Sequence, residues 1–274
     1  MSPPRRRLDA ELARRGLTSS RAEAHQAIAA GLVTVDGAPA LKPATQVHAG
    51  QALVVLAPPR RFVSRGGEKL AHALQVFPVE VTDRRCLDAG VSTGGFTDCL
   101  LQAGAASVAA YDVGYGQVHE RLRADPRVQV NERTNVRTLT PADIPSPRPD
   151  LLVADLSFIS LASVLPGLLA LVEPTDRVAA VVLVKPQFEA ERHEVGKGGV
   201  VRDPEVWARC LHRVATAASA CGWTVTGVTP SPLLGPAGNV EFLVHLEPGI
   251  ADPDAVTDRI GDAVTRARDQ VRDS

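Results

Sequence analysis

The sequence predicts an α/β protein with a small N-terminal α+β domain and a larger domain built on a mostly parallel sheet. Three observations predict this arrangement. Apolar runs alternate with helical patterns from residue 66 onward, which is typical of strands joined by crossover helices. A glycine-rich turn at residues 88–98 follows one strand and precedes a helix. Prolines at 58 and 59 separate this part from a compact N-terminal pattern of about sixty residues.

The composition suits a folded protein with a basic front. The 274 residues are 45% hydrophobic and 22% charged, so a sizeable core can form. Residues 1–65 hold ten Arg and Lys residues against four Asp and Glu residues, a net charge of +6, which leaves −7 for the remainder. This asymmetry indicates that the front contacts a polyanion. A basic surface that only faces solvent is the alternative.

Several classes of protein are disfavoured. The four cysteines form no C-x-x-C pair and the seven histidines are scattered, so we expect no metal site and no disulfide framework. The longest mostly apolar stretch, residues 161–172, is shorter than the roughly 18 residues that span a bilayer. No apolar segment follows the N-terminal arginines, as a secretory signal requires. We therefore expect a soluble cytoplasmic protein without a membrane span; its oligomeric state is not indicated.

The N-terminal domain, residues 1–59, is predicted as two helices followed by a small sheet. Leu8 and Leu12 lie four residues apart, on one face of a helix over residues 6–15. Ser20 is a suitable N-cap for the second helix, residues 21–30. Asp36 and Gly37 predict a tight turn after a strand at residues 32–35, and residues 51–56 read as a further strand.

The larger domain, residues 66–274, follows a linker at residues 60–65. Its predicted helices cover residues 68–75, 95–101, 117–123 and 252–273. Its predicted strands run through Leu87, up to Asp112, and over residues 150–155, 178–184, 223–228 and 242–245. Because this order predicts a mostly parallel sheet, ligands are expected outside the carboxyl ends of the strands.

The glycine-rich turn indicates a nucleoside ligand with positive charge. Its glycines, Gly90, Gly94 and Gly95, lack the G-x-G-x-x-G spacing of dinucleotide sites. Asp88 would repel a phosphate but attract the sulfonium and amino groups of S-adenosylmethionine. Asp112 ends the next strand, where an acid typically takes ribose hydroxyls. A turn-forming Asp88 and a strand-capping Asp112 are the structural alternatives.

Two lysines and one acid are candidates for the ligand site that we expect at the carboxyl edge of the sheet. Asp155 and Lys185 each follow an apolar strand directly. A lysine placed between a strand and a proline has little reason to be buried for packing. Lys69 lies in the first turn of a predicted helix, where the helix dipole disfavours a cation. A solvent-exposed lysine is the alternative for Lys69, and a purely structural lysine is the alternative for Lys185.

The first domain carries a recognisable pattern: Arg6-Arg7-Leu8-Asp9, Leu12-Ala13-Arg14-Arg15-Gly16, Ser20-Arg21, Ala24, Ile28, Gly31, Val33 and Val35-Asp36-Gly37. This pattern resembles the S4 RNA-binding domain. The resemblance implies that the helix pair lies on structured RNA, and guanidinium groups suit phosphates. With the arginines that follow the domain, the implied RNA-binding residues are Arg6, Arg7, Arg14, Arg15, Arg21, Arg60, Arg61 and Arg65.

The second domain carries three further motifs: Asp88-Ala89-Gly90-Val91-Ser92-Thr93-Gly94-Gly95-Phe96-Thr97-Asp98, Val184-Lys185-Pro186-Gln187-Phe188-Glu189 and Gly238-Asn239-Val240-Glu241-Phe242-Leu243. Residues 62–245 resemble the FtsJ-like branch of S-adenosylmethionine-dependent RNA 2′-O-methyltransferases. With the S4 front, the chain is similar to the TlyA family, whose members are also labelled hemolysins. The loop departs from the family pattern at Val91, where alanine or serine is expected.

This resemblance implies a Rossmann-like fold, S-adenosylmethionine as cofactor and no metal. The cofactor contacts are expected from Asp88, Gly90, Ser92, Thr93, Gly94, Gly95, Phe96, Asp112, Val113, Asn135 and Asp155. The family's Lys-Asp-Lys-Glu tetrad maps to Lys69, Asp155, Lys185 and Glu241. The implied acceptor is a cytidine 2′-hydroxyl in small- and large-subunit rRNA, within ribosomal subunits.

The tetrad suits methyl transfer to a hydroxyl. A ribose 2′-hydroxyl is a weak acid, so a positioned group must accept or share its proton, and Lys185 is the candidate. A second ammonium at Lys69 would lower the pKa of Lys185, whereas Asp155 and Glu241 would stabilise the charged lysines. The sequence leaves the balance between these effects open.

Three other functions remain as alternatives. A membrane-damaging protein, as the hemolysin label implies, needs an apolar span or an amphipathic basic helix, and neither is convincing here. A non-catalytic RNA-binding assembly factor would not need the intact tetrad. An NAD-dependent oxidoreductase lacks its glycine spacing and comes last.

Overall fold

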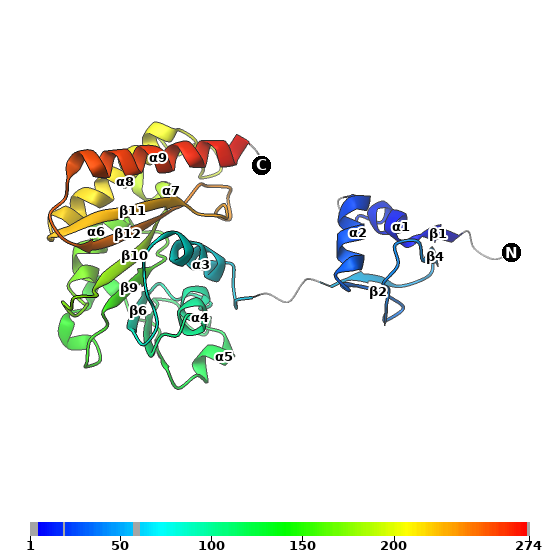
Figure 1. The fold of residues 1–274 in the computed structure, drawn as a ribbon, viewed down its shortest axis with the longest axis horizontal. Coiled ribbons are helices and arrows are strands. Elements are labelled where there is room, and N and C mark those ends of the chain that lie inside the picture. Colours follow the sequence, from blue (N-terminus) through cyan, green and yellow to red (C-terminus); the bar gives the residue numbers. More distant parts are fainter. Residues whose placement is uncertain (1–4, 19, 57–60, 273–274) are drawn as a thin grey trace. The chain divides into compact units, whose positions relative to one another are not determined.

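The computed structural model describes residues 5–18, 20–56 and 61–272. The chain divides into two compact units, Met1–Arg60 and Arg61–Ser274 (Figure 1). Residues 61–65, which the sequence analysis assigns to a linker, pack on the second unit. Phe62 is buried there, and the Val63 N–H donates to Asp98 Oδ2 at 2.8 Å.

The first unit is an α+β domain with two small sheets. Its elements are β1 (Arg5–Arg7), α1 (Leu8–Arg14), α2 (Arg21–Ala29), β2 (Val33–Val35), β3 (Ala38–Pro39), β4 (Gln46–His48) and β5 (Leu53–Val55). The strands form an antiparallel β3-β2-β5 sheet and a β1-β4 ribbon. The predicted N-cap at Ser20 is confirmed, since its Oγ accepts from the Glu23 N–H at 3.1 Å. Leu8, Leu12 and Ile28 are fully buried between the helices and the sheet.

The predicted start of the first helix is wrong. Arg6 and Arg7 belong to β1, where Arg6 pairs with Val47 and Arg7 with Gln46. The helix pattern set by Leu8 and Leu12 extends no further back, because the backbone of the arginines is used by strand pairing. Neighbouring strand residues point to opposite sides, so Arg6 and Arg7 face different directions.

The second unit alternates strands and helices. Its elements are α3 (Gly66–Val76), β6 (Arg85–Ala89), α4 (Gly95–Gln102), β7 (Ser107–Tyr111), α5 (Glu120–Arg123), β8 (Val128–Asn131), β9 (Leu151–Ala154), α6 (Leu161–Leu169), β10 (Ala179–Val184), α7 (Pro186–Glu189), α8 (Pro204–Ser219), β11 (Trp223–Pro230), β12 (Phe242–Pro248) and α9 (Pro253–Arg272), with 3₁₀ turns at Val136–Thr138 and Pro141–Asp143. The sequence analysis did not predict α6 and α8.

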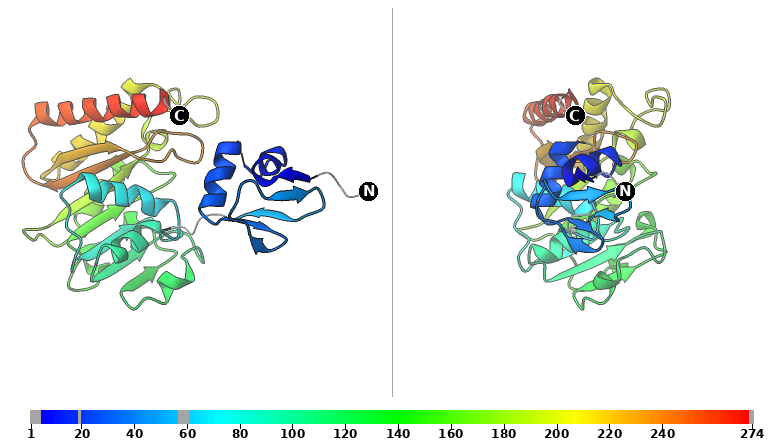
Figure 2. Two further views of the ribbon diagram at one scale, coloured as in Figure 1. Left: turned by 45° about the vertical axis from the view of Figure 1, so that its right-hand side comes forward. Right: turned by 90° about the vertical axis from the view of Figure 1, so that its right-hand side faces the viewer.

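The strands form one seven-stranded sheet in the order β11-β12-β10-β9-β6-β7-β8. Strands β10, β9, β6, β7 and β8 are parallel, and β12 and β11 are antiparallel additions. Helices cover both faces (Figure 2). Leu152 and Ala154 pack in the core with α6, α8 and α9, while Leu151 and Val153 pack in the core with α3 and α4. The predicted α/β class with a mostly parallel sheet is confirmed.

The order of the strands determines where the site lies. The chain builds outward from β6 to β7 and β8, and then returns to the other side of β6 to form β9 and β10. Ligands bind at such a switch point, outside the carboxyl ends of β6 and β9. Strand β12 is antiparallel to β10, so its first residue lies at this same edge of the sheet: Phe242 pairs with Val184 at the end of β10. Glu241, one residue earlier, therefore lies next to Lys185.

Candidate active site

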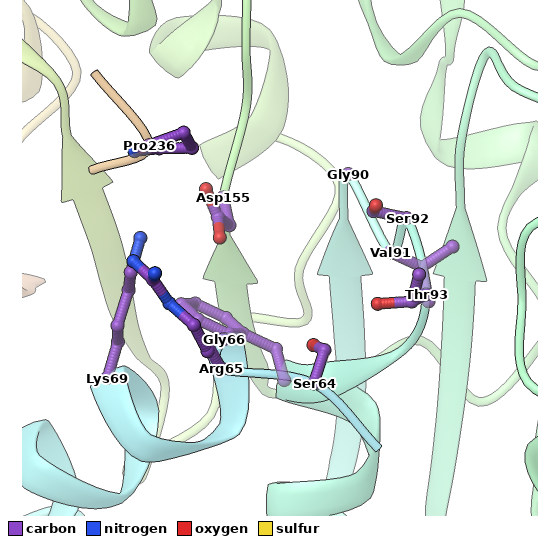
Figure 3. A pocket seen from close by; sticks show the side chains of 12 residues that line it. Ser64, Arg65, Gly66, Lys69, Gly90, Val91, Ser92, Thr93, Asp155 and Pro236 are labelled. Atoms are coloured by element: carbon purple, nitrogen blue, oxygen red, sulfur yellow. The ribbon is translucent and has the colours of Figure 1, made fainter. Parts of the chain in front are cut away.

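Two cavities lie at this edge of the sheet and share a wall. The first, of about 310 Å³, is lined by Ser64, Arg65, Gly66, Lys69, Gly90, Val91, Ser92, Thr93, Gly95, Phe96, Asp155 and Pro236. The second, of about 430 Å³, extends from the same wall past Asp112 and Asn135 to Phe158. Gly90, Ser92 and Asp155 line both cavities. In Figure 3, Lys69 and Arg65 reach from the start of α3 toward Asp155 at the end of β9.

Lys69 and Glu241 form a buried ion pair. Lys69 Nζ contacts Glu241 Oε2, and the two residues are only 6% and 1% exposed. The pair joins the first turn of α3 to the residue before β12, 172 positions away in the chain. This contact explains a cation at a helix N-terminus, since the neighbouring carboxylate compensates the unfavourable dipole.

Lys185 and Asp155 form the second pair. Lys185 Nζ lies 2.6 Å from Asp155 Oδ1, close enough for an ion pair but without the angles of a hydrogen bond. The ammonium donates instead to Ser157 Oγ at 2.8 Å. Strands β9 and β10 are parallel neighbours, so the residues that follow them meet at one edge. The structure thus brings the four predicted tetrad residues to one place, as two lysine–carboxylate pairs.

Asp112 lies in the second cavity and holds the glycine-rich loop. Its Oδ2 accepts from the Ser92 N–H and its Oδ1 from the Gly114 N–H, both at 2.7 Å. Ser92 adopts a positive φ of 48°, which turns its N–H toward this carboxylate. Each carboxylate oxygen keeps a further lone pair for a hydroxyl donor. Val113 and Asn135 line the same cavity.

Asp112→Ala should weaken S-adenosylmethionine binding by about tenfold to a hundredfold, because hydrogen bonds to a charged acceptor are lost. Calorimetric titration of the full chain, with and without ribosomal subunits, measures this. Asp125→Asn is a matched control, since Asp125 pairs with Arg127 outside both cavities. Unchanged affinity in Asp112→Ala would remove Asp112 from the cofactor site.

Asp88 does not reach either cavity. Its side chain is fully buried, Oδ2 accepts from Thr97 Oγ1 at 2.6 Å, and Oδ1 has no hydrogen-bond partner among the described residues. Burial is the main cause that raises the pKa of the Asp88 carboxyl to about 7; the Thr97 hydrogen bond opposes this shift, and the charge of Asp155 adds to it. The predicted contact of Asp88 with a cationic ligand is therefore not direct in this structure.

Asp88→Asn should change how stability depends on pH. An unfolded Asp loses its proton near pH 4, whereas the folded protein keeps it to about pH 7. Between these values wild type should lose stability relative to the variant as pH rises, by up to about 1.4 kcal/mol per pH unit. Denaturant titrations of both proteins from pH 4 to 8 test this. A constant difference would mean that Asp88 is ionised throughout.

The loop glycines are required by packing inside the protein. A Cβ at Gly90 would lie 2.6 Å from the Asp155 carbonyl oxygen, and one at Gly94 would lie 2.1 Å from Leu122 Cδ1. Gly94 and Gly90 also have positive φ values. Gly94 lines neither cavity. Of the predicted cofactor contacts, Gly90, Ser92, Thr93, Gly95, Phe96, Asp112, Val113, Asn135 and Asp155 line a cavity, and Asp88 and Gly94 do not.

Ser157 and Phe158 are among the lining residues of the second cavity that were not predicted. Ser157 supplies the hydrogen-bond acceptor for Lys185. Phe158 lines the second cavity, is 92% exposed, and packs against Phe188 with ring centroids 5.3 Å apart. Both lie within three residues after Asp155, and the rule that ligands bind beyond strand ends could have identified them.

The predicted RNA-binding arginines fall into three groups. Arg6, Arg7, Arg14, Arg15 and Arg21 each pair with Asp9 or Glu11 in the first unit. In the second unit, the Arg61 guanidinium lies 4.7 Å from the centre of the Phe62 ring, and Arg65 lines the first cavity and donates to the Leu234 carbonyl at 2.6 Å. Arg60 lies outside the described residues.

Within residues 5–18, 20–56 and 61–272, no helix is long and apolar enough to cross a membrane. The same described residues contain no group of three or more His, Cys, Asp or Glu side chains that could hold a metal ion.

Comparisons with known proteins agree with this geometry. Residues 62–247 match the FtsJ-like methyltransferase family, and residues 6–53 match the S4 domain. The chain is 57% identical, over 88% of its length and 90% of the relative's, to the 16S/23S rRNA (cytidine-2′-O)-methyltransferase TlyA of Mycobacterium tuberculosis. It is 48% identical, over 90% of its length and 87% of the relative's, to YqxC of Bacillus subtilis, which carries a provisional rRNA methyltransferase name.

A solved structure from Streptococcus thermophilus, which carries a provisional hemolysin name, covers 99% of this chain and 98% of its own with a TM-score of 0.73 and 37% identity. The family match covers most of the chain, and the site lies outside the carboxyl ends of the parallel strands, where open α/β sheets bind ligands. The chain therefore belongs to the TlyA family, in which an S4 domain precedes an FtsJ-like methyltransferase domain.

Proposed function

We propose that the protein transfers a methyl group from S-adenosylmethionine to the 2′-hydroxyl of a cytidine in ribosomal RNA within ribosomal subunits. One observation carries this proposal: two lysine–carboxylate pairs lie beside two adjoining cavities, with Lys69 lining the first cavity and Asp155 lining both. One cavity can then hold the methyl donor and the other the acceptor ribose. The name of the Mycobacterium tuberculosis relative supports the choice of acceptor. Such a protein acts where ribosomes are, in the cytoplasm.

The second cavity fits the cofactor. Its volume of about 430 Å³ lies in the range of small-molecule sites. Asp112 would take the ribose hydroxyls, while Val113 and Asn135 would contact the base. The loop residues Gly90 and Ser92 would face the reacting end. S-adenosylmethionine supplies an electrophilic methyl group on a positively charged sulfur.

The protein's own residues position the acceptor and accept its proton. As the 2′-oxygen takes the methyl group, its proton would pass to Lys185 Nζ, once that nitrogen has released the proton that it holds in the ion pair with Asp155. Asp155 and Ser157 hold that nitrogen at the cavity wall. Lys69, fixed by Glu241, places a second positive charge in the first cavity, where it orients the acceptor nucleotide. Alignment of the hydroxyl with the methyl group contributes as much as the proton transfer.

RNA would be held by both units. The N-terminal domain, residues 1–59, supplies basic side chains for phosphates, and arginine suits them because its guanidinium donates two parallel hydrogen bonds. In the second unit Arg65 lies in the first cavity beside Lys69, where it can meet a phosphate of the target strand. Binding should weaken steeply as salt rises.

The test is transfer of a labelled methyl group from S-adenosylmethionine to isolated 30S and 50S subunits, followed by mapping of the modified nucleotide. Label at a cytidine 2′-oxygen on either subunit supports the proposal. Label on a base, or no label on either subunit from protein that binds S-adenosylmethionine, contradicts it.

A further inference from the structure

The arginines of the first unit are arranged around two buried acids. Asp9 is fully buried and Glu11 is 1% exposed, although both lie on the short helix α1. Acids in a domain that binds a polyanion are electrostatically unfavourable, and burying a carboxylate has its own cost unless it is paired. Two acids at these positions therefore need a role that outweighs both costs.

The Asp9 carboxylate is contacted by side chains from two other elements. Arg7 of β1 donates from Nε to Oδ1 and from Nη2 to Oδ2, both at 3.1 Å. Arg21 and His25 of α2 each reach Asp9 Oδ2 at 2.9 Å. The Arg7 hydrogen bonds are the main cause that holds the pKa of Asp9 well below its usual range, so the carboxylate is charged.

The Glu11 carboxylate is likewise surrounded by arginine side chains. Arg14 donates from Nε to Oε2 at 2.7 Å and from Nη2 to Oε1 at 2.6 Å, and Arg15 donates from Nε to Oε1 at 2.9 Å. Arg6 lies 3.9 Å from Oε2. The Arg14 hydrogen bonds are the main cause that lowers the pKa of Glu11 to about 2.

The two clusters leave their arginines available to a ligand. The side chains of Arg6, Arg7, Arg14 and Arg21 are 44–62% exposed. The paired contacts of Arg7 and Arg14 use Nε and Nη2, so Nη1 and the outer Nη2 proton still point away from the acid. Five arginines against two carboxylates also keep the surface positive.

Arg15 is the exception. Beyond Glu11, its Nη1 donates to the Gln51 carbonyl at 2.9 Å and its Nη2 to the His48 and Ala49 carbonyls at 3.1 Å. Its side chain is 21% exposed. Arg15 therefore connects α1 to the loop before β5, and of the five arginines it has the fewest donors left for RNA.

We propose that Asp9 and Glu11 are positioning residues for RNA binding: each fixes the guanidinium groups around it in the orientation that meets the phosphates. A free arginine side chain loses rotamer entropy when it binds, whereas one held by a carboxylate has already lost it. This inference rests on the proposed RNA binding and adds that two negative charges strengthen it. Simple electrostatics predicts the opposite sign for their removal.

The experiment compares full-length Asp9→Asn and Glu11→Gln with Asp36→Asn. All three remove one negative charge from the first unit, but Asp36 bonds only Gln51 and the Ala52 N–H among the described contacts. Asp9→Asn keeps an oxygen for the Ala10 N–H, which bonds Oδ1 at 2.9 Å. Binding to 30S and 50S subunits is measured from low to high salt, beside S-adenosylmethionine affinity and thermal melting.

We expect Asp9→Asn and Glu11→Gln each to bind the subunits about tenfold more weakly, with a salt slope reduced by about one. Asp36→Asn should bind as well as wild type or better. Arg7→Ala and the double variant complete a cycle with Asp9→Asn; their effects should not add, because Asp9 acts through Arg7. A purely structural role would instead lower the melting temperature in parallel with binding, because partners in contact are coupled in stability as well.

Two outcomes would overturn the inference. In the first, the wild type binds the subunits, and Asp9→Asn and Glu11→Gln bind them as tightly as Asp36→Asn does. This result would reject the positioning role and leave the proposed function standing. Failure of wild type to bind either subunit would reject the RNA function together with the inference. If Asp9→Asn has a lower melting temperature than the wild type, the positioning role is tested instead with Glu11→Gln, in a double-mutant cycle with Arg14→Ala.

Discussion

Lys185→Ala is expected to lower methyl transfer to ribosomal subunits by about 10²–10⁴-fold, the usual contribution of a positioned proton acceptor. The loss should fall on the chemical step, because Lys185 Nζ contacts Asp155 and Ser157 at the cavity wall and lines no part of the cofactor cavity itself. Single-turnover transfer of a labelled methyl group at saturating S-adenosylmethionine measures that step directly.

Lys197→Ala is the matched control for this measurement. Lys197 is exposed and, unlike Lys185, has no contact with Asp155 or Ser157 among the described residues, so the same loss of charge should leave the rate unchanged. If Lys185→Ala kept a rate within a few-fold of wild type, proton transfer would have to be assigned to another group.

Lys69→Met is expected to lower the free energy of unfolding by about 3–5 kcal/mol, because it leaves the Glu241 carboxylate buried without its partner. Replacing both residues with methionine should restore much of that loss, since an apolar pair of similar volume needs no charge compensation. Urea denaturation of the two variants and wild type measures the difference.

The double variant also separates stability from catalysis. It should be folded and yet transfer methyl groups slowly, because the first cavity has lost the Lys69 ammonium that we propose orients the acceptor nucleotide. Equal stability of Lys69→Met and the double variant would show that Glu241 is not held as a buried charge in the folded protein.

The fold of the larger domain could be predicted because its signals are local. Apolar runs such as residues 150–154 and 179–184 specify buried strands, and the turn at residues 90–95 specifies the step from strand to helix. Asp155 and Lys185 could be placed at one edge for the same reason, since parallel strands all end there. The helices α6 and α8 were not predicted. Pro166 and Gly167 interrupt the apolar pattern of α6, whereas α8 has a local start signal, the N-cap Asp203 followed by Pro204.

The amino-acid sequence by itself determined the two domains, the parallel sheet and the residues that stand at its carboxyl edge, because each depends on a pattern within about ten neighbouring residues. Only the tertiary structure decided which groups meet. It paired Lys69 with Glu241 across 172 positions, turned Asp88 inward, and placed the arginines around Asp9 and Glu11. Such contacts depend on strand register and on how helices pack against the sheet, and no local pattern contains either.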